Sequence, residues 1–333
     1  MIKYLTAGES HGLYLTGIMD GFPYGVPVTK EFVSAQLFRR RTAPGRSARQ
    51  AAEKEDFEIT GGLYNGLTTG APVSVLIRNA VTGMPEESAV PRPGHADLGG
   101  MYKYGIFNAA LVRERASARE TAARCALGAF CLRLCELLGV SVTSEVRDLG
   151  KLQGVTEEAA EEELKRVTSL GDTAGGVFEL RINGLPAGLG SYSQGRRRLS
   201  AGIAHELYAI NAVKGVEIGD GFRLAGAYGS EIDDGREGGL DGGLTSGKPV
   251  TVRCAVKPVP GLAKGALSRH FVTGAEEVVF SKTSDTTAVY AAAVIAENVV
   301  SFALVDSLLE KFGGDSLDEI KERVDSWRRK TDV

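Results

Sequence analysis

The sequence lacks the features that define several large classes of protein. It has no run of about 18 uninterrupted apolar residues, so we expect no membrane-spanning helix. Its N-terminal stretch MIKYLTAGESHG lacks the apolar core that a signal peptide has. None of the four cysteines forms a C-x-x-C pair, which favours buried thiols in a reducing cytoplasm over a disulfide framework or a zinc site. The net charge of −3 argues against a nucleic-acid-binding surface.

The common cofactor and nucleophile motifs are missing as well. The chain has no G-x-G-x-x-G with an acid about 20 residues later and no G-x-x-x-x-G-K-[ST], so neither a dinucleotide fold nor a P-loop is indicated. It has no G-x-S-x-G elbow of a hydrolase. Four residues could imitate metal ligands: Glu9, Asp97, His11 and His95. No H-x-x-x-H or H-E-x-x-H spacing supports them, so we expect no metal.

Glycine is abundant, and it marks an internal repeat. The chain has 43 glycines in 333 residues. Residues 61–75 (GGLYNGLTTGAPVSV) and 238–252 (GGLDGGLTSGKPVTV) agree at ten of fifteen positions, at an offset of 177. This agreement predicts two copies of one α+β unit, roughly 1–150 and 170–315. Because no Pro/Ser-rich linker separates them, we expect one domain over 1–333 with a shared core.

Periodicity and capping signals predict the elements of each copy. Strands are expected at 12–20, 71–78, 176–183 and 248–256. Helices are expected at 30–40, 117–139, 156–168, 286–312 and 316–328. The spacing of Ser117 and Glu120 predicts a capping box at the start of the second helix, and Gly139 predicts its end. The helix 286–312 is apolar nearly all round and should be buried.

Two histidines are candidates for proton transfer. His11 and His95 lie in the Gly/Pro-rich stretches GESHG and RPGHAD, where core packing explains a histidine poorly. Histidine is the side chain that titrates near neutral pH without perturbation. These positions favour acid/base roles over structural hydrogen bonding, whereas His205 and His270 are interpreted as structural.

Arginines are concentrated in the first half of the chain. One group surrounds the Thr-Ala-Pro-Gly turn at 42–45, and a second enters the helix expected at 117–139. Arginine forks suit phosphate and carboxylate groups, and a helix N-terminus favours the same anions, so an anionic small-molecule site is indicated. The alternative is a solvated basic face with ion pairs such as Arg115 with Glu114 or Glu120. For Asp285, spacing alone favours a helix-start residue.

Together these motifs resemble the chorismate synthase family over nearly the whole chain. The matching pieces occur in order and include GESHG, RPGHAD, ERASARET and AVKGVEIG, followed by KP and the SD before the last long helix. The resemblance implies a β-α-β sandwich, which agrees with the two-copy pattern, and a homotetramer. It also implies a carbon–oxygen lyase of the shikimate pathway, which leads to aromatic amino acids.

The implied reaction is a 1,4-trans elimination. It converts 5-enolpyruvylshikimate 3-phosphate to chorismate and phosphate and requires reduced FMN without net redox change. Some family members also bind NADPH near the arginine-rich turn and reduce their own flavin, whereas others depend on an external flavin reductase. NADPH is therefore a candidate flavin reductant for this chain. The resemblance includes no nucleic-acid or membrane partner.

The resemblance also implies roles for individual residues. The catalytic group comprises His11 and His95 as acids, with Asp285 assisting proton abstraction. The substrate-binding group comprises Arg40, Arg46 and Arg119. The cofactor-binding group comprises Arg115, Ala116, Ser117, Asn211, Ala212, Gly242 and Lys257.

Several positions depart from the family pattern. Thr283 and Ala110 stand where the family usually has arginine, and the K-P-x-x-[ST] motif ends in Gly261. Each lost charged hydrogen bond corresponds to roughly 1.5–3 kcal/mol. These departures leave open an alternative, a family relative that binds flavin or an anionic metabolite without this activity. A structural or nucleic-acid-associated protein is the third possibility, against which the net charge argues.

Overall fold

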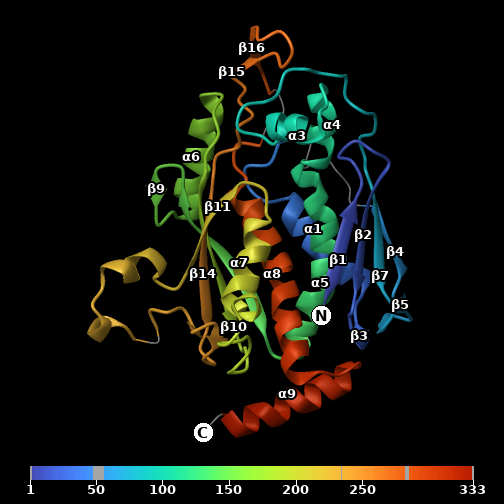
Figure 1. Ribbon diagram of the computed structural model, residues 1–333, viewed down its shortest axis with the longest axis vertical. Coiled ribbons are helices and arrows are strands. Elements are labelled where there is room, and N and C mark those ends of the chain that lie inside the picture. The colour runs from blue at the N-terminus through green and yellow to red at the C-terminus, as the bar shows by residue number, and fades with distance from the viewer. Residues whose placement is uncertain (1, 48–55, 234, 282–284, 332–333) are drawn as a thin grey trace.

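Two antiparallel sheets enclose a layer of helices. The computed structural model describes residues 2–47, 56–233, 235–281 and 285–331. Figure 1 shows one sheet on each side of α5, α7 and α8, with α9 crossing below them. The helices are α1 (Lys30–Arg41), α3 (Asp97–Tyr104), α4 (Ala109–Arg115), α5 (Thr121–Leu137), α6 (Glu157–Ser169), α7 (Leu199–Tyr208), α8 (Val289–Phe312) and α9 (Leu317–Thr331).

The first sheet has the order β1-β2-β7-β4. Its strands are β1 (Lys3–Ala7), β2 (Tyr14–Asp20), β7 (Val73–Arg78) and β4 (Asp56–Gly61). The alternating side chains Val73, Val75 and Ile77 of β7 are fully buried and belong to the same core as α5. Every second residue of β7 therefore faces the helix layer, as the pleat of a half-buried strand requires.

The second sheet has the order β11-β14-β10-β8-β9. Its strands are β11 (Val213–Ile218), β14 (Val250–Val256), β10 (Gly176–Asn183), β8 (Ser141–Leu149) and β9 (Leu152–Gln153). Pairing in register places Leu180 opposite Val252, and both are fully buried. The remaining strands form a three-stranded sheet of order β3-β6-β5 and two hairpins, β12-β13 and β15-β16. They are β3 (Tyr24–Pro27), β5 (Leu63–Tyr64), β6 (Leu67–Thr69), β12 (Leu240–Asp241), β13 (Leu244–Thr245), β15 (Ala266–Arg269) and β16 (Glu276–Val279).

The repeat seen in the sequence recurs as a repeat of buried hydrogen bonds. In the first hairpin, Thr68 Oγ1 donates to the Pro23 carbonyl at 2.6 Å and accepts from the Val26 N–H at 2.9 Å. Thr245, 177 positions later, makes the same pair of bonds at 2.6 and 2.8 Å. Each hairpin leads directly into a central strand, β7 or β14. The α+β sandwich built from two pseudo-repeats is thus confirmed.

Most expected elements form near their expected bounds, with two local corrections. The capping box is wrong: Ser117 caps a single 3₁₀ turn, Ala118–Glu120, and α5 begins only at Thr121. The Glu120 carboxylate accepts instead from Thr6 and Arg124.

The helix expected from 286 begins at Val289, so Asp285 lies outside it. The helix-start interpretation of Asp285 is therefore wrong. α8 is long and apolar enough to cross a membrane by composition, but 78% of its most apolar window is buried, as a core helix requires. Its neighbours α5 and α7 pack on it between the two sheets.

Candidate active site

His11 is held by a buried carboxylate. It lies in the loop between β1 and β2, and its Nδ1 is 2.8 Å from Oε1 of Glu114 on α4. Glu114 Oε2 accepts from the His11 backbone N–H at 2.7 Å, and the Glu114 carbonyl accepts from the Ser10 N–H at 3.1 Å. The Glu114 side chain is 3% exposed and the His11 side chain 23%. Glu114 therefore fixes the imidazole at Nδ1, and the ring remains partly accessible.

The turn after α4 joins this loop to a second segment. Ser117 Oγ donates to Ser10 Oγ at 3.1 Å. The Ala116 carbonyl, one residue earlier, accepts from the side-chain amide of Asn211 at 3.1 Å. Asn211 lies just after α7, so residues from both halves of the chain meet at this turn.

Arg119 supports the His11 loop through Asn79. Its side chain is 5% exposed and donates Nε to Asn79 Oδ1 at 2.9 Å. The Asn79 amide in turn donates to the carbonyls of Glu9 (3.1 Å) and Gly12 (2.9 Å). Asn79 therefore links the buried arginine to both sides of His11, so Arg119 supports the shape of this loop.

His95 lies in a loop that is braced by a buried ion pair. Its Nδ1 is 3.0 Å from the Pro93 carbonyl. Asp97, which is fully buried, accepts hydrogen bonds from Arg92 and from Arg113 Nε at 2.8 Å. Burial opposes the ionisation of Asp97, but the hydrogen bonds from Arg92 more than offset it, so the pKa of this carboxyl is held below its usual value. The loop around His95 is thereby held in one shape.

Lys257 joins the His95 loop to the end of α7. Its Nζ donates to the Gly94 carbonyl at 2.6 Å, and its backbone N–H donates to the Ala212 carbonyl at 2.9 Å. Ala212 has φ 71°, in the left-handed region that alanine rarely adopts. A continuous set of hydrogen bonds therefore runs from His95 through Lys257 to residues 211–212 and on to the turn beside His11.

Positive charge accumulates around His95. Burial lowers the pKa of His95 and the charges of Arg92 and Lys257 lower it further, which outweighs the opposite effects of the Pro93 carbonyl and Asp97. Burial also lowers the pKa of Lys257, with a contribution from Lys214. Each shift records a cation that is destabilised where it lies. The region therefore favours an anionic ligand, whose charge would offset the repulsion that these cations exert on His95 and Lys257.

Asp285 and Arg46 form a second buried centre. Arg46 Nη1 donates to Asp285 Oδ2 at 2.6 Å, and the Ser47 N–H donates to Oδ1 at 2.8 Å. The side chains of Arg46 and Asp285 are 6% and 11% exposed. Among the residues that the structure describes, Arg46 Nε and Ser47 Oγ are buried without a hydrogen-bond partner. Such atoms are rare in folded proteins and indicate where a ligand would bind.

Arg40 and Arg115 contact different segments. Arg40 is 1% exposed and donates to Thr121 Oγ1 at 2.9 Å and to the Ala118 carbonyl at 3.0 Å. Arg115 is exposed and donates twice to Thr6, at 2.9 Å to each oxygen. The alternative of a solvated basic face predicted that Arg115 pairs with Glu114 or Glu120. Arg115 bonds Thr6 instead.

Gly242 lies apart from the other candidates within this chain. Its hairpin contacts the start of α7, where the Leu199 N–H donates to the Gly243 carbonyl at 3.0 Å. Asn211 and Ala212 follow the other end of this ten-residue helix, about 15 Å away at 1.5 Å per residue.

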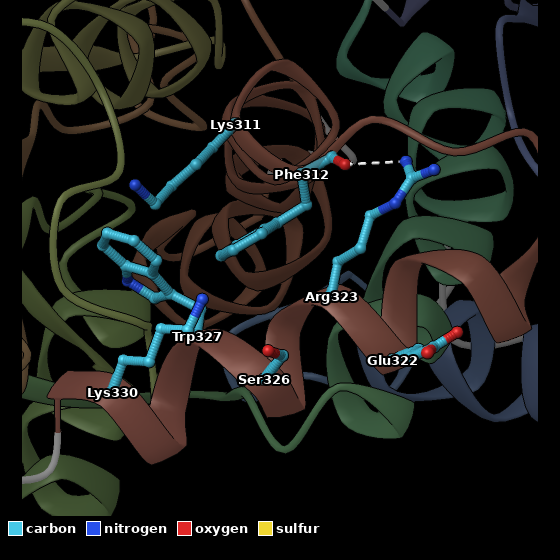
Figure 2. Close-up of a pocket in the computed structure, with 7 residues that line it drawn as sticks. All are labelled: Lys311, Phe312, Glu322, Arg323, Ser326, Trp327 and Lys330. Carbon is cyan, nitrogen blue, oxygen red and sulfur yellow. Dashed lines mark hydrogen bonds between the residues drawn. The ribbon is translucent and has the colours of Figure 1, made fainter.

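Two cavities border the helix layer. One, of about 440 Å³, lies between the end of α8 and α9, where Lys311, Trp327 and Arg323 surround Phe312 (Figure 2). The other, of about 790 Å³, lies between the 42–44 turn, β8 and α8. Neither is lined by a candidate catalytic residue in the part of the chain described.

Comparisons with known proteins identify the family of this chain. A family model described as chorismate synthase matches residues 2–309. The chorismate synthase of Sulfurihydrogenibium sp. (strain YO3AOP1) is 37% identical over 385 residues, covering 99% of each chain. That of Frankia alni is 38% identical over 387 residues, covering 98% of each. A solved structure named "Crystal Structure of Chorismate Synthase" superposes with a TM-score of 0.79 at 31% identity, over 99% of this chain and 98% of the other.

The chain belongs to the chorismate synthase family. It therefore carries the activity of that family: it is a lyase that removes phosphate from 5-enolpyruvylshikimate 3-phosphate to give chorismate. The substrate is small and phosphorylated, which agrees with the charges of Arg92 and Lys257 beside His95.

Chorismate synthases require a reduced flavin, and the residues here fit an anionic group of that kind. The excess positive charge near Lys257 and the orphaned Nε of Arg46 both mark places where a phosphate or carboxylate would be stabilised. The Ala116 carbonyl and the Asn211 side chain are joined by a hydrogen bond of 3.1 Å in the same network as Lys257.

The departures from the family pattern have different structural settings. Ala110 is 1% exposed, and Asn108 Oδ1 accepts both its N–H (3.0 Å) and that of Ser88 (3.2 Å). Asn108 thus fixes the start of α4, the helix that carries Glu114. Gly261 follows β14 within the loop to β15. Thr283 lies outside the described residues.

Two site residues were not identified from the sequence. Glu114 was considered only as an ion-pair partner of Arg115, although it opens the ERASARET motif. Asn79 carried no signal, because its role arises from contacts with a loop about 70 residues earlier.

Proposed function

We propose that this chain carries out a 1,4-trans elimination with reduced FMN, and that His11, His95 and Asp285 provide its proton-transfer groups. The observation that supports this is the hydrogen-bond network that joins the two histidine loops through Lys257, Asn211 and Ser117. When bound, the reduced flavin supplies transient electron density that assists departure of the allylic phosphate.

Cationic groups hold the substrate anions in this proposal. Arg46 offers a buried guanidinium whose Nε lacks a partner among the described residues, and Arg119 and Arg40 shape the adjoining turn. Charge stabilisation by fixed donors in a water-poor site is the largest contribution that a protein can make to departure of a phosphate. We assign these three arginines to substrate binding, with Arg40 and Arg46 also as candidates for NADPH.

His95 donates its proton at the departing phosphate. In the absence of ligand, its lowered pKa favours the neutral imidazole. A bound anion offsets the charges of Arg92 and Lys257 and so raises the pKa of His95 toward the protonated form. The acid is therefore charged when the substrate is present.

Asp285 takes part in removal of the C6 proton. Both of its oxygens accept hydrogen bonds, which is the pattern of an ionised carboxylate. The substrate loses one proton and one phosphate, so the elimination involves no net oxidation. His11 is assigned as the second acid, near the flavin.

The cofactor-binding group comprises Arg115, Ala116, Ser117, Asn211, Ala212, Gly242 and Lys257. Of these, all but Arg115 and Gly242 belong to the network around His11 and His95, and Arg115 bonds Thr6 on β1. We further propose a homotetramer, located in the cytoplasm, whose flavin is reduced by NADPH or by an external flavin reductase. The four free cysteines are all buried, as is usual in a reducing compartment.

Anaerobic turnover with chemically reduced FMN tests the proposal. Chorismate and phosphate should form in equal amounts from 5-enolpyruvylshikimate 3-phosphate, and His11→Ala and His95→Ala should each lower kcat strongly in folded protein. Normal kcat in both variants would refute the assigned roles. Flavin binding without product would favour a relative that binds flavin but does not carry out the elimination.

A further inference from the structure

We propose that Glu114 is a positioning residue for His11, which holds the imidazole in the Nδ1–H tautomer so that proton transfer takes place at Nε2. This inference rests on the proposed function, because it concerns how His11 performs the role given to it there.

Geometry determines which atom carries the proton. Glu114 Oε1 is 2.8 Å from His11 Nδ1, and Oε2 accepts from the His11 backbone N–H at 2.7 Å. An ionised carboxylate only accepts hydrogen bonds, so Nδ1 must be the donor. The remaining exchangeable proton of the imidazolium is then on Nε2. When this N–H bond breaks and an O–H or N–H bond forms on the ligand, the neutral ring left behind is already the tautomer that Glu114 stabilises.

Burial makes this restraint strong. The Glu114 side chain is 3% exposed, and within the described residues His11 supplies all of its hydrogen bonds. A carboxylate buried to this extent requires such partners, because desolvation of an unpaired charge costs several kcal/mol. The same residue also fixes the preceding backbone, since its carbonyl accepts from the Ser10 N–H at 3.1 Å.

The isosteric change Glu114→Gln reverses the preference. The His11 backbone N–H can only donate, so the amide oxygen of glutamine should take the place of Oε2. Its NH₂ group then faces Nδ1 and donates to it, which forces the proton of the neutral ring onto Nε2. The variant keeps the shape of the side chain and exchanges one tautomer for the other.

Nitrogen NMR on ¹⁵N-histidine-labelled protein reads the tautomer directly. The chain has four histidines, so the His11 signals can be assigned from a single His11→Ala variant. At a pH where the rings are neutral, we expect Nδ1–H in the parent protein and Nε2–H in Glu114→Gln. A parent protein with the proton on Nε2 would overturn the proposal, and this result needs no variant to fold.

Kinetics provide the second readout. Glu114→Gln should lower kcat by about 10²-fold, the lower range for loss of general acid catalysis, with little change in KM. In a His11→Ala background the same substitution should cause no further loss, because Glu114 acts only through His11. Glu114→Asp keeps an ionised acceptor and should retain the parent tautomer and much of kcat.

Glu120→Gln is the matched control. Glu120 lies on the same segment with a side chain 13% exposed, but it bonds Arg124 and Thr6 rather than His11. Its effect on kcat should be the same with and without His11. Additive losses for Glu114→Gln in the His11→Ala background would show a merely structural role. An inactive parent protein with the expected tautomer would instead count against the proposed function alone.

Discussion

Replacing Asp285 with asparagine should destabilise the protein and also stop efficient turnover. The substitution removes a charge that accepts from Arg46 at 2.6 Å, in a pair whose side chains are 6% and 11% exposed. The amide oxygen can still accept from the Ser47 N–H. Arg46 is then left as a buried cation without its counter-ion, and its Nε already lacks a partner among the described residues.

The size of the effect follows from this burial. Removal of one partner of a buried pair costs about 3–5 kcal/mol, whereas the retained Ser47 bond places Asp285→Asn near the lower end, at about 3 kcal/mol. Urea unfolding measures this change. Turnover should fall by about 10²-fold, because the substitution removes the carboxylate that we propose as the proton acceptor. Inorganic phosphate should raise the Tm of the variant more than that of the parent, because Arg46 is available to bind it.

Asp56→Asn is the control for an exposed pair. Asp56 and Arg78 are 3.8 Å apart and 70% and 63% exposed, so the substitution should change stability by less than about 1 kcal/mol. An Asp285→Asn variant that is as stable as Asp56→Asn and turns over normally would refute both the structural and the chemical reasoning.

Three further predictions concern other parts of the site and the fold. The protonated fraction of His95 in the free enzyme falls as pH rises through its lowered pKa, so kcat/KM should decline through a pKa below the ordinary value of 6.5. Because bound substrate raises the pKa of His95, kcat should hold to higher pH than kcat/KM. Coincident pH profiles of kcat and kcat/KM would contradict this. Asn79→Ala removes the hydrogen bond that Arg119 Nε donates to Asn79 Oδ1, so urea unfolding should show a loss of about 1.5–3 kcal/mol, and Asn79→Asp, which keeps an acceptor oxygen, should lose less. Thr68→Val and Thr245→Val should each lower the free energy of unfolding by about 1–3 kcal/mol in the same assay, and the double variant should show the sum of the two losses. Clearly unequal losses in the two single variants would argue against equivalent roles in the two halves.

Much of the fold was determined locally and could be predicted from the sequence. α1, α6 and β10 form where periodicity placed them, and the Thr29 side chain caps α1 by accepting from the Phe32 N–H at 3.2 Å. The repeated GG-x-x-x-GLT segments form two hairpins whose glycines adopt positive φ, a feature that acts within a few residues. Such features depend on near neighbours, so they are readable without a tertiary structure.

The sequence also determined which residue types perform the chemistry, but not how they are held. GESHG and RPGHAD pointed to His11 and His95, yet Glu114 and Asn79 lie 103 and 70 positions from the residues that they hold. Likewise, Asp285 reads locally as a helix-start residue, and only folding brings it to Arg46, 239 positions away. Hydrogen bonds between segments so far apart depend on how two sheets pack around α5 and α8, and no local pattern encodes that packing.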